Sequence, residues 1–389
     1  MDNQFDPLSI SDLPVETLEH ILRFCEGYSY LTSQVCPSWR KVVLAWGNLK
    51  EKFIDMCFEE GWPCVARFPG SYFTITRLHS LVKNENIDLL RAARQRGASV
   101  FICQSFAADV GSLKVLQWYK KEVGQLPSCS VGKLAASRGH RKVIDWLIEK
   151  HFYLGSEVMA GAAEFGDLEM VQKLRENSCN WGEEVCESAA EKGHLEILKW
   201  LRSNPEDLCP WNEGTSRKAA QGGDLETLKW LKEQNCPWHS DVSLILTMGG
   251  HFEALKWEMA NGGHWDAKMF GWIAEKGNIE VLQWAREKGY PHNNSFTASA
   301  ASHGQLEVLK WAVREGFSLA PKCIELAIFH GDFETIRWLR KQGQPWPQKN
   351  SLPLLRRVKD EVRVWAIENG CPESFFELKL MEDFDWEFN

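Results

Sequence analysis

The sequence lacks the features that mark several classes of protein. No stretch approaches the roughly 20 consecutive apolar residues of a membrane-spanning helix, so we expect no membrane partner. No run of Lys and Arg forms the basic patch that binds phosphate backbones, so we expect no nucleic-acid partner. The 12 cysteines form no Cys-x-x-Cys pair, and the nearest approaches, Cys57/Cys64 and Cys179/Cys186, are wider than zinc-ligand spacing.

Signatures of catalysis and of targeting are also missing. The sequence has no Gly-x-Ser-x-Gly, P-loop, His-Glu-x-x-His or Gly-x-Gly-x-x-Gly motif, so we expect no enzyme activity, catalytic residue, metal or cofactor. The first nine residues hold two acids and no base, and no apolar run follows, which is the opposite of a secretory signal. We therefore expect an intracellular protein with reduced thiols, in the cytoplasm or, as a second candidate compartment, the nucleus.

Tryptophan is in excess, with 19 residues against 6 tyrosines, and most of it belongs to an internal repeat. The motif reads G-H-L-E-I-L-K-W from Gly193 to Trp200 and G-N-I-E-V-L-Q-W from Gly277 to Trp284. The steps between repeat glycines are 27 residues, except for a first step of 28 and one step of 30. The repeat glycines are Gly111, Gly139, Gly166, Gly193, Gly223, Gly250, Gly277, Gly304 and Gly331. Such a period predicts a solenoid, and the long step is explained by extra residues in S-N-P-E-D-L-C-P-W before Trp211.

Two repeat positions account for most of the tryptophan. Nine residues end the motif: Trp118, Trp146, Trp200, Trp230, Trp257, Trp284, Trp311, Trp338 and Trp365. Five more occupy a second position: Trp181, Trp211, Trp238, Trp265 and Trp346. The tryptophans that end the motif lie on the same face as the repeat leucines, which favours framework packing over a ligand-stacking stripe.

Each repeat reads as two short helices. An alanine-rich segment such as Ala135-Ala136 predicts a first helix that neighbours approach closely, and the repeat glycine suits the left-handed position that ends it. The next residue is Asp, Asn, Ser, His or Gln, and we expect it to cap the second helix. His140, His194 and His251 share this position with acids and amides, so we interpret them as caps and not as metal ligands. Neither helix, at ~10 residues, is stable alone, so stacking must supply the core.

Weaker copies extend the array at both ends. The segment from Glu85 to Arg91 fits the register, and Trp365 lies 27 residues after Trp338. We predict about eleven repeats over residues 81–372, with residues 47–80 as a junction or N-terminal cap. Residues 373–389 form an acidic, aromatic tail, interpreted either as a capping helix over the last repeat or as an acidic–hydrophobic docking motif.

The repeat resembles the A-A-x-x-G-H-L-E-V-x-K-W-L half of the ankyrin motif. It departs from ankyrin repeats in lacking the T-P-L-H opening and in having a period of about 27 instead of 33 residues. The resemblance implies an all-α, ankyrin-like helix–turn–helix solenoid whose projecting hairpin fingers are shortened or lost.

Residues 8–46 lie outside the repeat and read as a helical hairpin. Leu13-Pro14, Glu16, Leu18, Ile21-Leu22, Val35-Cys36 and Trp39-Arg40 resemble the F-box pattern L-P-x-E-x-L-x-x-I-L…V-C-x-x-W-R, and only the E-G-Y-S-Y segment between the helices departs from it. The resemblance implies docking onto the Skp-type adaptor of a cullin–RING ubiquitin ligase. The implied adaptor-binding residues are Leu13, Pro14, Leu18, Ile21, Leu22, Val35 and Trp39. Such box-plus-repeat chains are frequent in amoebae, algae and giant DNA viruses, which would place a viral member in the host cytoplasm.

Three functions are open at this point. The first is a substrate receptor of that ligase, monomeric within the complex, whose repeats bind a target protein. The second is a non-enzymatic ankyrin-repeat scaffold with a degenerate F-box, and the third is an enzyme with an unrecognised site. Residues that fail to repeat between units are the candidates for target binding: Asn212, Glu213, His239, Ser240, Asp266, Lys268, Asn293 and Asn294.

Overall fold

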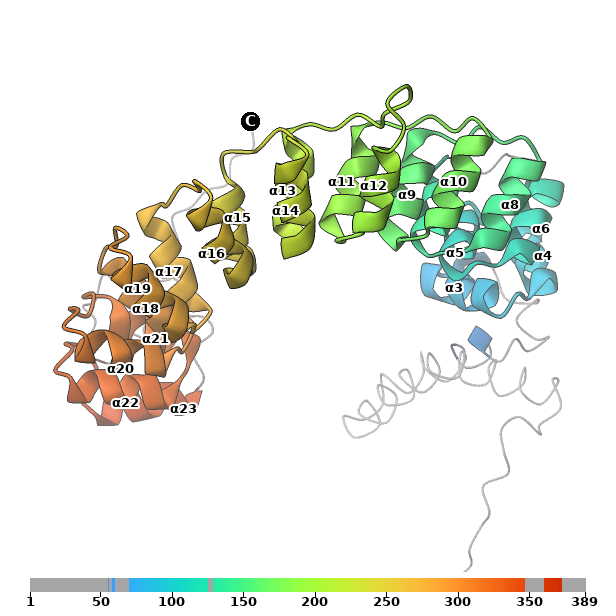
Figure 1. Cartoon of the computed structure of the whole chain (residues 1–389). Coiled ribbons are helices and arrows are strands. Elements are labelled where there is room, and N and C mark those ends of the chain that lie inside the picture. Colours follow the sequence, from blue (N-terminus) through green and yellow to red (C-terminus); the bar gives the residue numbers. More distant parts are fainter. Residues whose placement is uncertain (1–54, 56–57, 60–69, 125–128, 347–359, 373–389) are drawn as a thin grey trace, which may run out of the picture. The chain divides into compact units, whose positions relative to one another are not determined.

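The computed structural model describes residues 55, 58–59, 70–124, 129–346 and 360–372 (Figure 1). Throughout these residues the regular elements are helices, without a strand, and they recur as pairs, which confirms the predicted all-α repeat solenoid. The chain divides into two compact units. Unit 1 comprises Met1–Ala189 with Lys199–Pro210, and unit 2 comprises Ala190–Leu198 with Trp211–Asn389.

The helices alternate between a first and a second member of each repeat. The first helices are α3 (Ile75–Lys83), α5 (Cys103–Val110), α7 (Cys129–Ser137), α9 (Ser156–Phe165), α11 (Glu183–Glu191), α13 (Glu213–Gly222), α15 (Val242–Gly249), α17 (Ala267–Glu275), α19 (Ser295–Ser302) and α21 (Cys323–His330). The second helices are α4 (Ile87–Gln95), α6 (Leu113–Val123), α8 (Arg141–Glu149), α10 (Leu168–Glu176), α12 (Leu195–Leu201), α14 (Leu225–Glu233), α16 (Phe252–Ala260), α18 (Ile279–Glu287), α20 (Leu306–Arg314), α22 (Phe333–Lys341) and α23 (Asp360–Glu368). A single 3-10 turn, η3 (Gly70–Tyr72), precedes α3, and the predicted array start at residue 81 falls inside α3.

Stacking of like helices forms the core of each unit. In unit 1 the first helices α3, α5, α7 and α9 contact one another in order, and in unit 2 α13 to α21 do the same. Each first helix also contacts the second helix that follows it (Figure 1). The predicted small residues lie at these contacts, because Ala135-Ala136, Ala162-Ala163 and Ala300-Ala301 are fully buried.

The turn inside each repeat is left-handed, as the glycines predict. All nine repeat glycines have φ between 65° and 91°, a region that side chains with a Cβ rarely adopt. Glu85 takes the glycine's place in the first described repeat, with φ of 52°. A second left-handed position ends many of the second helices. Glycine fills it at Gly262, Gly289, Gly316 and Gly343, whereas His151, Ser178 and Asn235 fill it in three other repeats.

The residue after the repeat glycine works in two ways, only one of which the sequence predicted. Ser112, Asp167 and Asn278 cap the second helix, since each side chain accepts a hydrogen bond from the backbone N–H three residues on. The prediction is wrong for His140 and His251, which make no such bond.

Those imidazoles instead reach the preceding repeat. His140 Nε2 lies 2.8 Å from the Asp109 carbonyl oxygen, and His251 Nε2 lies 3.1 Å from that of Gln221. Gln305 likewise donates to the Glu275 carbonyl at 2.9 Å. The physical reason is length: these side chains are long enough to satisfy a carbonyl at the end of the neighbouring first helix, which has no partner inside that helix.

The two tryptophan positions pack against each other, which explains why both repeat. Five indole pairs, each 19 residues apart, have ring centroids 5.9–6.4 Å apart and planes at 63–75°, the edge-to-face geometry that aromatic rings prefer. The pairs are Trp181/Trp200, Trp211/Trp230, Trp238/Trp257, Trp265/Trp284 and Trp346/Trp365. Framework packing of these tryptophans is therefore confirmed.

Candidate binding site

The predicted site residues fall into two groups. Leu13, Pro14, Leu18, Ile21, Leu22, Val35 and Trp39, which carry the F-box resemblance, lie outside the described residues, as do the F-box-like module, most of the junction and the acidic tail. The eight predicted target-binding residues all belong to unit 2. They occupy equivalent places, in or beside the loops that lead into α13, α15, α17 and α19.

Several of these eight residues have structural work in their own loops. Asn212 and Asp266 cap α13 and α17, because their side chains accept hydrogen bonds from the backbone N–H groups of Gly214 and Lys268 at 2.7 Å. Asn294 donates to Ser318 Oγ at 2.6 Å and so joins two successive loops. Of the same eight, Glu213, Ser240, Lys268, Asn293 and Asn294 are exposed.

A more enclosed site lies in unit 1, at the repeat with the 30-residue step. The loop between α12 and α13 contains the extra residues, and a turn fixes its tip: Asn204 Oδ1 accepts from the Glu206 N–H at 3.2 Å. Asp207 then forms two-pronged ion-pair contacts with Arg175 of α10, with Nη2 to Oδ1 at 2.6 Å and Nε to Oδ2 at 3.0 Å. This fork geometry fixes both the distance and the orientation of the loop.

Arg175 is itself held by three further features of the repeat. Its Nη1 donates to the Cys179 carbonyl at 3.2 Å, and its guanidinium lies 4.1 Å from the Trp181 ring centroid. Trp181 in turn packs edge-to-face on Trp200. Arg202, at the same position in the next repeat, donates to the Cys209 carbonyl at 2.7 Å. An arginine at this position therefore ties the end of a second helix to the loop that follows it.

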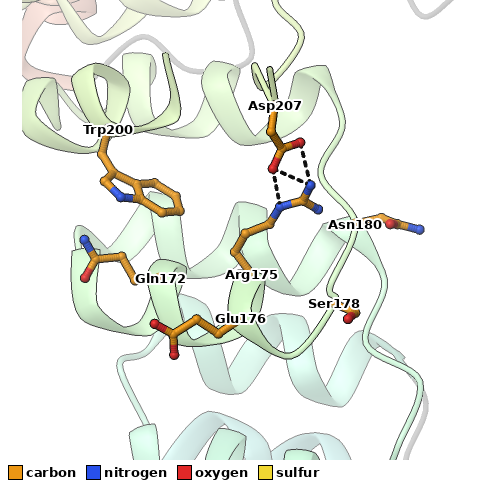
Figure 2. Close-up of a pocket in the computed structure, with 7 residues that line it drawn as sticks. All are labelled: Gln172, Arg175, Glu176, Ser178, Asn180, Trp200 and Asp207. Carbon is orange, nitrogen blue, oxygen red and sulfur yellow. Dashed lines mark hydrogen bonds and ion pairs between the residues drawn. The ribbon is translucent and has the colours of Figure 1, made fainter. Parts of the chain in front are cut away.

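The inserted loop closes one side of a pocket of about 740 Å³ in unit 1 (Figure 2). Figure 2 shows the Trp200 ring pointing from α12 toward Gln172 and Arg175 on α10. The residues that line the pocket are Gln172, Arg175, Glu176, Ser178, Asn180, Trp200 and Asp207. The lining thus combines one aromatic face, two carboxylates, two amides and one arginine that is already paired.

A smaller pocket of about 270 Å³ adjoins the first and shares Ser178 and Asn180 with it. Tyr153, whose side chain is 76% exposed, lies on its rim. Ser178 holds a left-handed backbone at φ of 61°, which costs a residue with a Cβ about 1–2 kcal/mol. The two pockets therefore form one continuous surface over successive loops of unit 1.

These loops are joined by buried cysteines. Cys179 Sγ lies 3.2 Å from the Leu154 carbonyl oxygen, and Cys209 Sγ lies 3.5 Å from that of Gly182. Burial raises the pKa of the Cys179 thiol to about 11, and that of Cys103 to about 12, so both are protonated at neutral pH. They therefore act as small buried thiols, as their repeat spacing predicted, and are poor nucleophiles.

The described residues provide no arrangement of three or more His, Cys, Asp or Glu side chains that fits a metal ion. Within the same part of the chain, no helix has the length and apolar character that crossing a bilayer requires.

Comparisons with known proteins add little detail. No family model matches the chain, and no curated protein matches it. Among solved structures, the chain is similar to the pentatricopeptide repeat protein PPR10 in complex with an 18-nt psaJ RNA element, at 13% identity and a TM-score of 0.40, over 92% of this chain and 66% of that one. PPR10 from maize gives 14% identity and a TM-score of 0.37 over the same shares. The chain thus spans about two thirds of the length of these helical repeat proteins.

Sequence reasoning found the irregular repeat but missed its pocket. Two signals were present: the 30-residue step, and Lys173 in the place of the tryptophan that ends the motif. Both belong to the region where the pocket lies. The bond between Arg175 and Asp207 was not predictable, because the two residues are 32 positions apart and only the fold of the inserted loop brings them together.

Proposed function

We propose that this chain is a protein-interaction adaptor and, more specifically, the substrate receptor of a cullin–RING ubiquitin ligase of the Skp-adaptor type. The F-box-like residues, Leu13 to Trp39, would dock the adaptor, and the repeats would bind a target protein. The chain would act as a monomer within the complex, in the cytoplasm or nucleus, and would carry out no chemistry itself.

The observation that carries this proposal is the combination of two features in one chain. The L-P-x-E-x-L-x-x-I-L…V-C-x-x-W-R pattern stands at the N-terminal side of a helical repeat array. A repeat array of this kind offers an extended series of loops for recognition. The clamped pocket of unit 1 gives that series one place with a defined shape.

The proposed mechanism is proximity. A receptor that holds its target beside the charged conjugating enzyme turns ubiquitin transfer into an effectively intramolecular step, which raises the effective concentration of target lysines. The rate then depends on target affinity and geometry, with no catalytic group from this chain.

We also propose that the repeats are divergent, short ankyrin repeats. Support comes from the buried alanine pairs at the helix–helix contacts and from the left-handed glycine before each second helix. The loops between repeats are short, as expected if the projecting fingers are reduced.

The decisive experiment is a pulldown of the full chain with a Skp-type adaptor. Wild type should retain the adaptor, and a Leu13→Ala, Pro14→Ala variant should lose it, because those residues head the first F-box helix. A Phe5→Ala, Pro7→Ala variant is the matched control, since it removes an aromatic residue and a proline just outside the pattern. If wild type does not bind the adaptor, the ligase role fails and the scaffold with a degenerate box takes its place.

The target is best sought by proximity labelling with and without a proteasome inhibitor. A target of the ligase should accumulate in the labelled fraction when the proteasome is blocked, and should do so less with the Leu13→Ala, Pro14→Ala variant. Labelled proteins whose levels ignore both changes would indicate a scaffold.

A further inference from the structure

We infer that the pocket at the irregular repeat binds a lysine or arginine side chain carried by a segment of the partner protein. This inference rests on the proposal that the repeats bind a target protein, and it adds the chemistry of the recognised segment.

The shape of the pocket is fixed before any partner arrives. The inserted loop is held by the Arg175–Asp207 fork, by the Arg202 bond to the Cys209 carbonyl and by the turn at Asn204. A site whose walls are already ordered loses little conformational entropy on binding. The pocket is therefore suited to recognise one side chain specifically.

The charge of the pocket favours a cation. Glu176 is exposed and forms no ion pair with any described residue, and Asp207 adds a second carboxylate. The only basic residue in the lining, Arg175, already spends its guanidinium on Asp207, on Trp181 and on the Cys179 carbonyl. An anionic ligand would therefore meet unpaired negative charge and no available donor cation.

The irregular repeat also omits a cation that other repeats carry. Gln172 occupies the position of Lys229, Lys256 and Lys310, each of which forms an ion pair with a glutamate three residues earlier. In this repeat the equivalent Glu169 pairs instead with Arg141 of α8. The neutral Gln172 leaves the floor of the pocket without the positive charge that the regular repeats place there.

The aromatic wall fits the same ligand. Cations of this chain lie over other tryptophans that end the motif, since Lys232 Nζ is 5.4 Å from the centroid of Trp257 and Arg337 is 5.8 Å from that of Trp365. No cation of the described residues lies over Trp200, although this indole is only half-buried and faces the pocket. A partner's lysine or arginine would complete there the cation–π contact that the framework makes elsewhere.

The adjoining surface defines what flanks the cation. Tyr153 offers an exposed ring, and Asn180, which both pockets share, offers an amide that can bond to a partner's backbone. Tyrosine, tryptophan and arginine are the side chains that most often anchor protein interfaces. The segment that fits is an extended peptide with a basic residue and a neighbouring apolar residue.

The test is selection of a random dodecapeptide phage library on the full-length chain, followed by fluorescence anisotropy with the best labelled peptide. The selected peptides should share a lysine or arginine beside an apolar residue. Changing that basic residue to glutamine should weaken binding at least tenfold. A labelled single-stranded RNA oligonucleotide, measured alongside, should bind more weakly than the peptide.

Variants locate the binding site. Glu176→Lys and Gln172→Lys should each weaken the peptide at least tenfold, because both put positive charge into the pocket. Gln172→Lys only restores the residue of other repeats, so the fold should tolerate it, and thermal unfolding checks this. The matched control is Glu233→Lys, at the same repeat position as Glu176 but in unit 2, which should change affinity less than twofold.

Three results would overturn the inference: peptides without a shared basic residue, peptides that bind Gln172→Lys as well as wild type, or stronger binding of the RNA. Adaptor pulldown with the same variants separates this inference from the proposed function. Variants that lose the peptide and keep the adaptor support the pocket, whereas a chain that binds the peptide but never the adaptor refutes only the ligase role.

Discussion

The repeat counted from Gly166 and the repeat counted from Gly223 place a basic residue at the same position and use it differently. In the regular repeat, Lys232 donates to Glu258 at 3.0 Å, and that carboxylate is only 4% exposed. Trp238 Nε1–H donates to the other oxygen of Glu258 at 3.0 Å, and Lys232 covers the Trp238 ring. The ion pair is thus part of the framework.

In the irregular repeat, Arg175 keeps its contact with the tryptophan ring but pairs outward, with Asp207 of the inserted loop, whose side chain is 41% exposed. An ion pair that faces solvent stabilises the fold little, whereas one that is buried is costly to break. The difference shows how a repeat can give up a framework ion pair and use the same cation to shape a surface. The following predictions test this contrast.

The largest effect should come from the buried carboxylate. Glu258→Ala should lower the free energy of unfolding by about 3 kcal/mol, because it leaves Lys232 and the Trp238 N–H without their partner. Asp207→Ala, the counterpart in the irregular repeat, should cost only about 0.5 kcal/mol. Urea denaturation of both variants measures this, and equal costs would contradict the contrast.

The next effect concerns the caps of the second helices. Asp167, capping α10, is almost fully buried and bonds two nitrogens of Arg141, whereas Asp224, capping α14, has no such arginine. Burial by itself raises the pKa of Asp167, but the bonds from Arg141 and Met170 N–H outweigh it and leave the pKa below its ordinary value. Asp167→Asn should therefore cost about 1.5 kcal/mol at pH 7, and Asp224→Asn less than about 0.5 kcal/mol.

The pH dependence of the Asp167 effect follows from the sign of that shift. A carboxyl group with a lowered pKa in the folded state contributes stability above its unfolded pKa of about 4, and loses it as pH falls through the folded pKa. The difference between wild type and Asp167→Asn should thus be constant from pH 8 to 5 and shrink below pH 4. A difference that grows toward acid would show that Asp167 is not ionised in its pair.

A smaller effect should come from the left-handed position after the second helix. Ser178→Gly should raise the free energy of unfolding by about 1 kcal/mol, since glycine accepts φ of 61° without strain. Gly289→Ser is the reverse change in unit 2, at a glycine with no atom within 4 Å of a built Cβ, and should lower stability by a similar amount. Thermal unfolding checks both, and a loss of stability in Ser178→Gly would mean that the serine side chain holds the pocket.

The smallest effect on stability should come from the insertion itself. Deleting residues 205–207 restores the 27-residue step and should change the free energy of unfolding by less than about 0.5 kcal/mol, because only an exposed loop and a half-exposed ion pair are lost. The selected peptide should nevertheless bind at least tenfold more weakly. Unchanged peptide affinity would show that the loop forms no wall of the binding site.

Much of the framework was predictable from the sequence, because each repeat position has one local physical role. Gly166 and its equivalents mark a backbone region that excludes Cβ, and Leu198 and its equivalents mark the buried face of a helix. These constraints act within a few residues, so a period of 27 exposes them directly.

Contacts between repeats were not predictable in the same way. The bond from His140 to the Asp109 carbonyl and the pairing of Trp181 with Trp200 depend on how far one helix pair is displaced from the next. Nothing in a single repeat encodes that displacement. The predicted target-binding residues were chosen because they fail to repeat, and that criterion cannot separate Asn212, which caps a helix, from an exposed residue such as Lys268.

The five indole pairs also give this protein a built-in optical signal. Two indoles about 6 Å apart and steeply inclined have electronic transitions that couple, so each pair should contribute a split circular-dichroism band that a lone tryptophan lacks. The Trp181/Trp200 pair reports on unit 1, and the other four report on unit 2. Replacing one tryptophan of a pair by phenylalanine would silence that pair alone, so local melting could be followed repeat by repeat without attaching a dye.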